Sequence, residues 1–252
     1  IQIGDRVRVA GFTSGRRENH MHAEHLLLPD DVELLTGFSR EPIWSGSAIG
    51  TESGVVDPTL IDAPVGNGIF RVWTRTGGTW YFATPENYPL TASAVEASAD
   101  WNDLEDNPIL QCEPPGMPVI MGNPYPMEFI DHGNVIELRF EEFDAVREIH
   151  IDGEVPVNQP YSPMGYSTGH WEVDTLVVST SLINWPYFNR VGVPQTRQVE
   201  VHERFAFADA EAIDYALTII DPGTLTEPYI WNARYVWRAG EAVNRYGCTL
   251  EG

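Results

Sequence analysis

Two charged residues stand on otherwise apolar strand faces, and they are the side chains best placed to carry chemistry. Glu203 alternates in register with Val201 and Phe205, and Arg147 alternates in register with Ile149. An unpaired charge inside a barrel costs several kcal/mol. We therefore expect Arg147 and Glu203 to pair with each other, with another buried group or with a ligand.

Two interpretations of this pair remain open. In an enzyme, Glu203 would act as general acid or base and Arg147 would hold an oxyanion or carboxylate, which suits a cofactor-independent lyase or isomerase. In a structural tie, the two would form a buried ion pair whose remaining hydrogen bonds come from adjacent tyrosines. The enzyme interpretation places a ligand in an aromatic pocket above the pair. The predicted ligand-binding side chains are Trp171, Tyr215, Trp231 and Tyr235.

The elements that must position these residues have a period of two. From about Met117 to the end, apolar residues alternate with polar ones in successive runs, as in residues 199–207, 213–219 and 229–237. Such runs with short connections predict an antiparallel β-meander. We expect it to close into an up-and-down, lipocalin-like barrel or a strongly curved sheet, because closure removes exposed strand edges.

The N-terminal part differs in character. Residues 4–11 and 22–28 predict a small β-hairpin segment, and residues 91–104 predict one short helix with Thr91 as its N-cap. The composition of residues 38–68, rich in Gly, Pro, Ser and Thr, predicts either a linker or an irregular segment that wraps around the fold. We predict two domains: an N-terminal β-segment with its linker over residues 1–65, and a barrel over residues 66–252.

Composition limits the partners. The chain has 15 Lys and Arg against 37 Asp and Glu, a formal net charge of -22. This charge repels phosphate backbones and anionic lipid surfaces, so we expect no nucleic-acid partner. We also expect no membrane insertion, because apolar runs fall short of the roughly 18 residues of a membrane helix. Phosphate-binding glycine loops and cofactor motifs are missing from the sequence, and we predict no cofactor.

A cluster of histidines suggests a metal site as an alternative. His20, His22 and His25 lie within a few residues of Glu18 and Glu24, although the spacing matches no standard metal motif. The other interpretation of this segment is a polar hairpin tip. Three further histidines fall opposite the apolar faces and are predicted to point outward: His150, His170 and His202.

The chain has two cysteines, Cys112 and Cys248, at the entry to the meander and near its end. They lack the spacing of a zinc site. A disulfide between them would tie the terminus to the barrel, provided that the compartment is oxidising. Both the bridged and the free state remain open at this point.

Several segments resemble one family. Residues 165–178 read GYSTGHWEVDTLVV, and elements at residues 147–153, 201–205 and 218–222 accompany them. This pattern is similar to a group of uncharacterised exported bacterial proteins, in which a DUF6152-like N-terminal domain precedes a lipocalin-like β-meander. Val173 departs from the family pattern, which has glycine there.

The resemblance implies a periplasmic or secreted protein whose barrel holds a small apolar molecule. It also implies that residues 4–31 are the tail of a small OB-like barrel, and that the barrel domain associates with a preceding N-terminal domain. The chain begins at Ile1 rather than Met, and we expect either a mature product whose leader has been removed or a recombinant form of the chain.

The predicted function is binding of a small apolar or aromatic molecule inside a β-barrel. Whether the barrel also catalyses a cofactor-independent lyase or isomerase reaction is left open by the sequence. The alternatives are a solid, non-catalytic structural or interaction barrel and a metal-binding exported protein.

Overall fold

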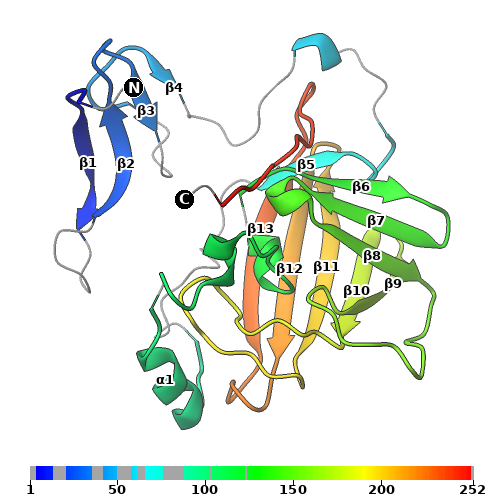
Figure 1. Cartoon of the computed structure of the whole chain (residues 1–252). Coiled ribbons are helices and arrows are strands. Elements are labelled where there is room, and N and C mark those ends of the chain that lie inside the picture. Colours follow the sequence, from blue (N-terminus) through cyan, green and yellow to red (C-terminus); the bar gives the residue numbers. More distant parts are fainter. Residues whose placement is uncertain are drawn as a thin grey trace. The chain divides into compact units, whose positions relative to one another are not determined.

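The computed structural model describes residues 4–13, 21–35, 42–49, 58–61, 66–75, 88–102, 104–122 and 124–250. The chain divides into two compact units, residues 1–55 and 56–252. It is mainly β, with a small sheet in the first unit and a closed barrel in the second (Figure 1). Among the described residues, no helix has the length and hydropathy needed to cross a membrane.

The first unit holds a sheet of four strands in the order β1-β2-β3-β4. Its strands are β1 (Arg8–Thr13), β2 (Met21–Leu27), β3 (Glu33–Leu35) and β4 (Ala48–Ile49). The antiparallel pairing of β1 with β2 confirms the predicted N-terminal strand pair. The sheet continues with an antiparallel β2–β3 pair and ends on a parallel β3–β4 pair.

A buried carboxylate holds the loop between β3 and β4. Glu33 Oε1 accepts a hydrogen bond from the Ile43 N–H at 3.0 Å, and Oε2 accepts from the Trp44 and Ser45 N–H groups at 2.7 and 3.0 Å. His25 Nδ1 lies 2.6 Å from Oε1. Burial by itself raises the pKa of Glu33, but these four hydrogen-bond partners outweigh it and lower the pKa to about 2.

This arrangement predicts acid sensitivity of the first unit. A carboxylate with a pKa depressed from 4.5 to about 2 stabilises the fold above pH 4.5. That stabilisation is lost as the pH falls from 4.5 towards 2, because the unfolded state then binds the proton more readily. The protection factors of the Trp44 and Ser45 amides, which compare the observed exchange rate with the intrinsic rate at the same pH, should therefore fall over this window. In Glu33→Gln these protection factors should already be lower at neutral pH and should change little between pH 4.5 and 2; protection factors equal to those of the unmodified protein would contradict the anchor.

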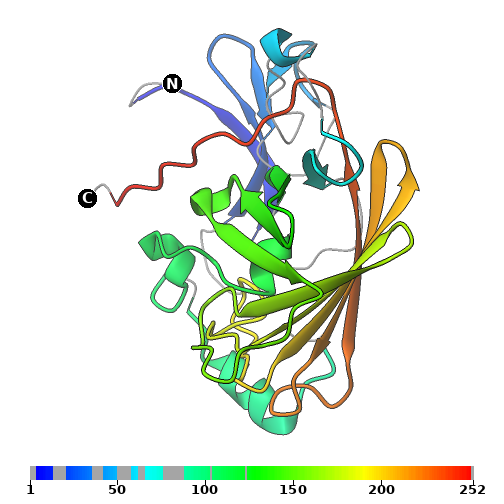
Figure 2. The same ribbon diagram turned by 90° about the vertical axis from the view of Figure 1, so that its right-hand side faces the viewer.

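The second unit is a nine-strand closed barrel in the order β10-β11-β12-β13-β5-β6-β7-β8-β9. Its strands are β5 (Val72–Arg75), β6 (Met127–Asp131), β7 (Val135–Phe140), β8 (Val146–Ile151), β9 (Tyr166–Glu172), β10 (Thr175–Ser181), β11 (Glu200–Asp209), β12 (Ala212–Ile220) and β13 (Tyr229–Val236). The strands twist strongly along their length, as Figure 2 shows from the side. The predicted mainly β, barrel-forming fold is confirmed.

Alternation along the strands fills the barrel with apolar side chains. Ile136, Leu138 and Phe140 on β7 are buried, and the same holds for Val201 and Phe205 on β11. On β12 and β13 the buried set is Ile213, Tyr215, Leu217, Ile219, Trp231, Ala233 and Tyr235. The predicted faces are confirmed, because a half-buried sheet requires its apolar residues at every second position.

One pairing departs from a pure up-and-down barrel. All neighbouring strands are antiparallel except β8 and β9, which run parallel over only three residue pairs, Ile149–Ile151 with Ser167–Gly169. A parallel pair needs a longer crossover, here residues 152–165 between the two strands. The barrel therefore closes through a short parallel seam.

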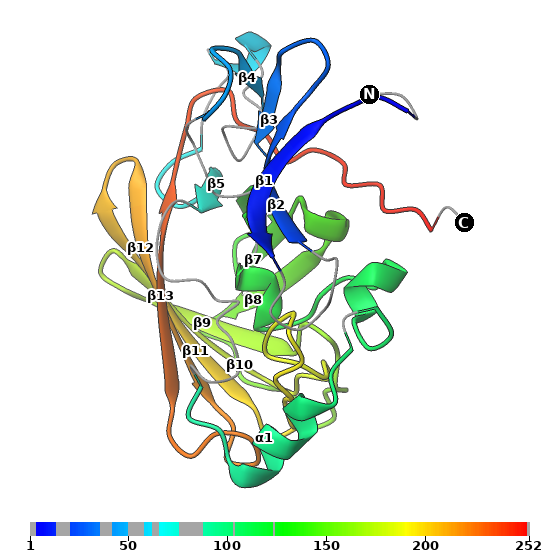
Figure 3. The same cartoon turned by 90° about the vertical axis from the view of Figure 1, so that its left-hand side faces the viewer.

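The second unit also contains short helices. The α-helix α1 (Ala92–Ala99) is shorter than predicted, and Thr91 Oγ1 caps it by accepting from Ala94 N at 3.3 Å. It lies at one end of the barrel, as Figure 3 shows. The 3-10 helices are η1 (Pro58–Leu60), η3 (Pro108–Gln111), η4 (Val119–Gly122) and η5 (Glu142–Asp144). All four residues of η4 are buried.

The β9–β10 hairpin turns at Val173 and Asp174. Val173 adopts a positive φ of 57° and is almost fully exposed. A β-branched residue rarely takes this left-handed conformation, which glycine adopts without steric cost. The position where the chain departs from the family pattern is therefore one that glycine would fit better, and the predicted hairpin forms nevertheless.

A disulfide joins Cys112 and Cys248, so the bridged alternative is the one realised. It fixes the C-terminal tail, which follows β13, to the residue after η3. The tail also packs on η5: the Asn244 N–H donates to Glu141 Oε2 at 2.9 Å and the Tyr246 N–H donates to Asp144 Oδ1 at 3.1 Å.

Candidate functional site

The two charged residues singled out from the sequence meet inside the barrel. Arg147 on β8 and Glu203 on β11 form a two-pronged ion pair, with Nη1 3.0 Å from Oε1 and Nη2 bonded to Oε2. Their side chains are 1% and 0% exposed. Of the three kinds of partner left open by the sequence, the structure shows the first: the two residues pair with each other.

Neighbouring strands satisfy the remaining donors of the guanidinium. Arg147 Nε donates to Ser167 Oγ on β9 at 2.9 Å, and Nη2 donates to Thr180 Oγ1 on β10 at 2.7 Å. Nη1 also lies 3.7 Å from the Met121 sulfur on η4. A guanidinium has five N–H donors, and each has an acceptor here. The cluster thus connects four consecutive strands, β8 to β11, across the parallel seam.

Two tyrosines complete the cluster. The Tyr215 hydroxyl donates to Glu203 Oε1 at 2.7 Å, and the Tyr235 hydroxyl donates to the Met121 carbonyl at 2.9 Å. Burial, and then the charge of the Glu203 carboxylate, raise the pKa of Tyr215 well above its ordinary value. The Tyr215 phenol therefore keeps its proton and remains a donor to the carboxylate.

The predicted aromatic pocket is formed in part. The Tyr215 ring centre lies 5.7 Å from that of Trp231 and 5.5 Å from that of Tyr235, both in edge-to-face contact. Trp171 does not join them, since it is 39% exposed. Trp171 lies near the end of β9, close to the turn at Val173. Its position in the alternation faces inward, but it lies at the rim of the barrel and so remains partly exposed.

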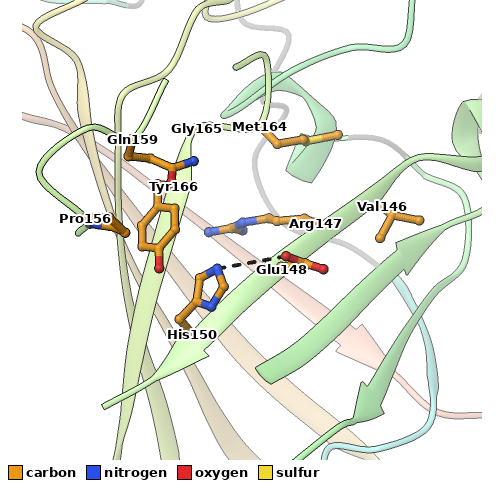
Figure 4. A pocket seen from close by; sticks show the side chains of 9 residues that line it. All are labelled: Val146, Arg147, Glu148, His150, Pro156, Gln159, Met164, Gly165 and Tyr166. Carbon is orange, nitrogen blue, oxygen red and sulfur yellow. Dashed lines mark ion pairs between the residues drawn. The ribbon is translucent and has the colours of Figure 1, made fainter. Parts of the chain in front are cut away.

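A groove opens at the parallel seam. It has a volume of about 610 Å³. Its lining residues are Val146, Arg147, Glu148, His150, Pro156, Gln159, Met164, Gly165 and Tyr166. Figure 4 shows Arg147 reaching between its two walls, with Tyr166, Gln159 and Pro156 on one side and Val146 on the other.

The groove exists because the two strands diverge. Continued in register, the β8–β9 pairing would place Val146 beside Met164, Arg147 beside Gly165 and Glu148 beside Tyr166. All six residues line the groove instead. The chain before β9 turns away to pair with residues 182–184: the Ser162 N–H donates to the Leu182 carbonyl and the Asn184 N–H donates to the Ser162 carbonyl.

An aromatic stack stands at the wall of the groove. The rings of His150 and Tyr166 lie 4.4 Å apart and nearly parallel, at 8°. Glu148 Oε2 lies 3.9 Å from His150 Nε2, the ion pair drawn in Figure 4. The groove thus combines a flat ring surface, one carboxylate and the apolar side chains of Val146, Pro156 and Met164.

The predicted outward direction of His150, His170 and His202 agrees with their side-chain exposures of 27%, 53% and 44%. Of the suggested metal ligands, His20 lies outside the described residues and nothing is described for the side chain of His22. His25 is buried, with Nδ1 against Glu33. Within the described ranges, no three His, Cys, Asp or Glu side chains gather in a way that could hold a metal ion.

Sequence reasoning missed Thr180, Met121 and the groove. Thr180 carries a signal, because it follows Leu176 and Val178 at a spacing of two and so faces inward. Met121 carries none, since the segment around η4 has no strand period. The groove depends on which strands are neighbours in the barrel. The sequences of β8 and β9 do not predict that the two strands lie side by side.

The fold and the site define a closed β-barrel with a buried five-residue polar cluster, Arg147, Ser167, Thr180, Glu203 and Tyr215, behind an open seam. No family model, curated protein or solved structure matches the chain.

Proposed function

We propose that this barrel binds a small apolar or aromatic molecule in the groove at the β8–β9 seam, without turnover. The observation that carries the proposal is the groove itself, whose volume of about 610 Å³ suits a small ligand. Ligand sites typically measure about 300–1,000 Å³ and combine apolar walls with a few polar groups. The lining is mixed: Val146, Pro156 and Met164 supply apolar surface, the His150–Tyr166 stack supplies a ring face, and Glu148 and Gln159 supply polar groups.

The packing of the barrel supports a site at the seam rather than in the interior, where the sequence suggested it. Trp73, Trp231, Phe129, Phe140 and Phe205 are fully buried in one cluster. Val119, Ile120 and Met121 of η4 belong to the same cluster. These side chains occupy the centre that a lipocalin-like ligand would need.

The hydrogen bonds of the cluster favour binding over catalysis. A general acid or base must reach the substrate proton within about 3 Å. Glu203 is fully buried, and Arg147 and Tyr215 already donate to its oxygens. We therefore propose that Arg147 and Glu203 hold the seam strands in place, and that the lyase or isomerase interpretation does not apply.

We also propose that the protein works in an oxidising compartment, periplasmic or secreted. The support is the Cys112–Cys248 disulfide, because such bonds persist mainly outside reducing cytosol. Membership in the exported, DUF6152-like group remains a proposal that rests on the sequence pattern at residues 165–178.

Fluorescence titration with the neutral aromatic dye N-phenyl-1-naphthylamine tests the ligand site. We expect saturable binding, and a Kd raised at least about tenfold in Tyr166→Ala, the equivalent of about 1.4 kcal/mol for the lost ring contact. Ile230→Ala is the matched control, because Ile230 is a large, exposed apolar side chain on β13, remote from the groove lining.

Equal affinity of Tyr166→Ala and the unmodified protein would remove the groove as the ligand site. Lack of saturable binding up to millimolar dye would favour the second candidate, a solid structural or interaction barrel, which the packed interior also supports.

A further inference from the structure

The backbone of β8 presents hydrogen-bonding groups on the side of the groove. In an antiparallel pair, the backbone groups of alternate residues point to opposite neighbours. The Phe140 N–H donates to the Ala145 carbonyl and the Ile151 N–H donates to the Asn134 carbonyl, which fixes the odd-numbered residues of β8 as partners of β7. The N–H and C=O groups of Val146 and Glu148 consequently point the other way, towards the seam.

The residue that should pair with them is engaged elsewhere. Continuing the parallel ladder would bring Gly165 to the Val146 carbonyl and to the Glu148 N–H. The Gly165 N–H instead donates to the Ser162 carbonyl at 3.0 Å, and its carbonyl accepts from Ser162 Oγ at 3.0 Å. Within the described part of the chain, the register offers no other strand partner at this point.

This turn at Gly165 is firmly built. Gly165 has a positive φ of 69°, and a Cβ there would lie 2.5 Å from the Ser181 carbonyl oxygen and 2.9 Å from a Thr180 methyl group. Both conditions select glycine. The backbone of Gly165 therefore stays beside β10, and the edge of β8 at Val146 and Glu148 remains turned to the groove.

The residues around this edge of β8 favour a ligand with a particular sign of charge. Glu148 is 64% exposed at the groove, and the whole chain carries a net charge of -22. Val146 beside it is 45% exposed. An apolar residue beside Val146 and a basic one beside Glu148 would complement the edge.

We infer that the groove binds a short extended peptide segment, neutral or basic, which adds to the edge of β8 by backbone hydrogen bonds to Val146 and Glu148. This inference gives the same groove a second kind of ligand, and it rests on the proposed function because it requires the groove to be a ligand site. Strand addition uses the main chain for affinity and alternate side chains for specificity. From Val146 to Glu148 is two steps of about 3.3 Å, so two to four ligand residues take part.

The test uses the capped tetrapeptide acetyl-Val-Ala-Lys-Ala-amide, whose Val and Lys share one face. Titration followed by amide NMR should give saturable binding, a shift of the Glu148 amide proton and its protection from exchange. The same peptide with Glu in place of Lys should bind at least tenfold more weakly. N-methylation of the peptide amides, one at a time, should abolish binding at alternate positions only.

Val146→Pro tests the protein side, because the Val146 N–H faces the groove and its removal leaves the β7 ladder intact. Val146→Thr keeps the N–H and loses apolar surface, so the proline variant should lose at least fivefold more peptide affinity than the threonine variant. The N-methyl peptides decide the matter if the proline variant does not fold.

The outcomes separate the two proposals. Dye binding without any peptide binding up to millimolar concentration would overturn strand addition and leave the ligand site standing. Peptide binding that tolerates every N-methyl group would also overturn it. Failure of both dye and peptide to bind would overturn the proposed function as well.

Discussion

Replacing Arg147 by methionine should lower the free energy of unfolding of the barrel by about 3–5 kcal/mol. The reason is the position of Glu203, whose carboxylate is fully buried and accepts a hydrogen bond from the Arg147 guanidinium at each of its two oxygens. Without that partner, a charge is left in the interior, and among the described residues the Tyr215 hydroxyl is the remaining donor to it. Urea denaturation followed by near-UV circular dichroism measures the loss.

A double variant gives the sharper control. Arg147→Met combined with Glu203→Leu removes both charges and leaves Ser167 and Thr180 bonded to each other at 2.9 Å. We expect it to lie within about 2 kcal/mol of the unmodified protein and to be more stable than either single variant, because a buried ion pair and a packed apolar pair are often nearly equivalent. A single-variant loss below about 1 kcal/mol would show that the pair is not the tie between strands β8 to β11.

Removing the disulfide should have an effect of similar size. Cys112 and Cys248 are 136 residues apart in sequence, and a loop of this length strongly restricts the unfolded chain. Cys112→Ser with Cys248→Ser should cost about 2–5 kcal/mol, read as a lower urea midpoint. Reductant should bring the unmodified protein to the same midpoint.

The double serine variant is its own control, since reductant should leave it unchanged. Hydrogen exchange adds a local readout: the Asn244 and Tyr246 amides, which donate to Glu141 and Asp144, should exchange faster once the tail is released. A urea midpoint that does not respond to reductant would contradict a stabilising role of the disulfide.

Much of the fold was predictable from the sequence, and the reasons are local. Alternation at residues 199–207 and 213–219 is a property of neighbouring side chains, so it identified strands, faces and the inward direction of Glu203. Thr91 marked the start of α1 for the same kind of reason, because an N-cap acts within one turn. The predicted pairing of Arg147 with Glu203 followed from the high cost of isolated buried charge.

Prediction failed where distant segments decide. The alternation along β9 predicts that Trp171 points into the barrel. Trp171 is nevertheless 39% exposed, because it lies near the end of β9 at the barrel rim, and the alternation does not show where the strand ends. The packing of η4 against Arg147 and Tyr235 joins segments that are far apart in sequence. The hydrophobic pattern of the sequence around η4 has no strand period that would predict this contact.

The buried pair of Arg147 and Glu203 shows what the sequence determines and what the tertiary structure decides. By itself the sequence determined that Arg147 and Glu203 face the inside of a β-barrel, since alternation and the cost of desolvation act on each strand alone. Only the tertiary structure decided that β8 and β9 are parallel neighbours joined over three residue pairs, and that Gly165 turns back to Ser162. Strand order and register arise from the packing of the whole barrel, and they place the groove beside Arg147.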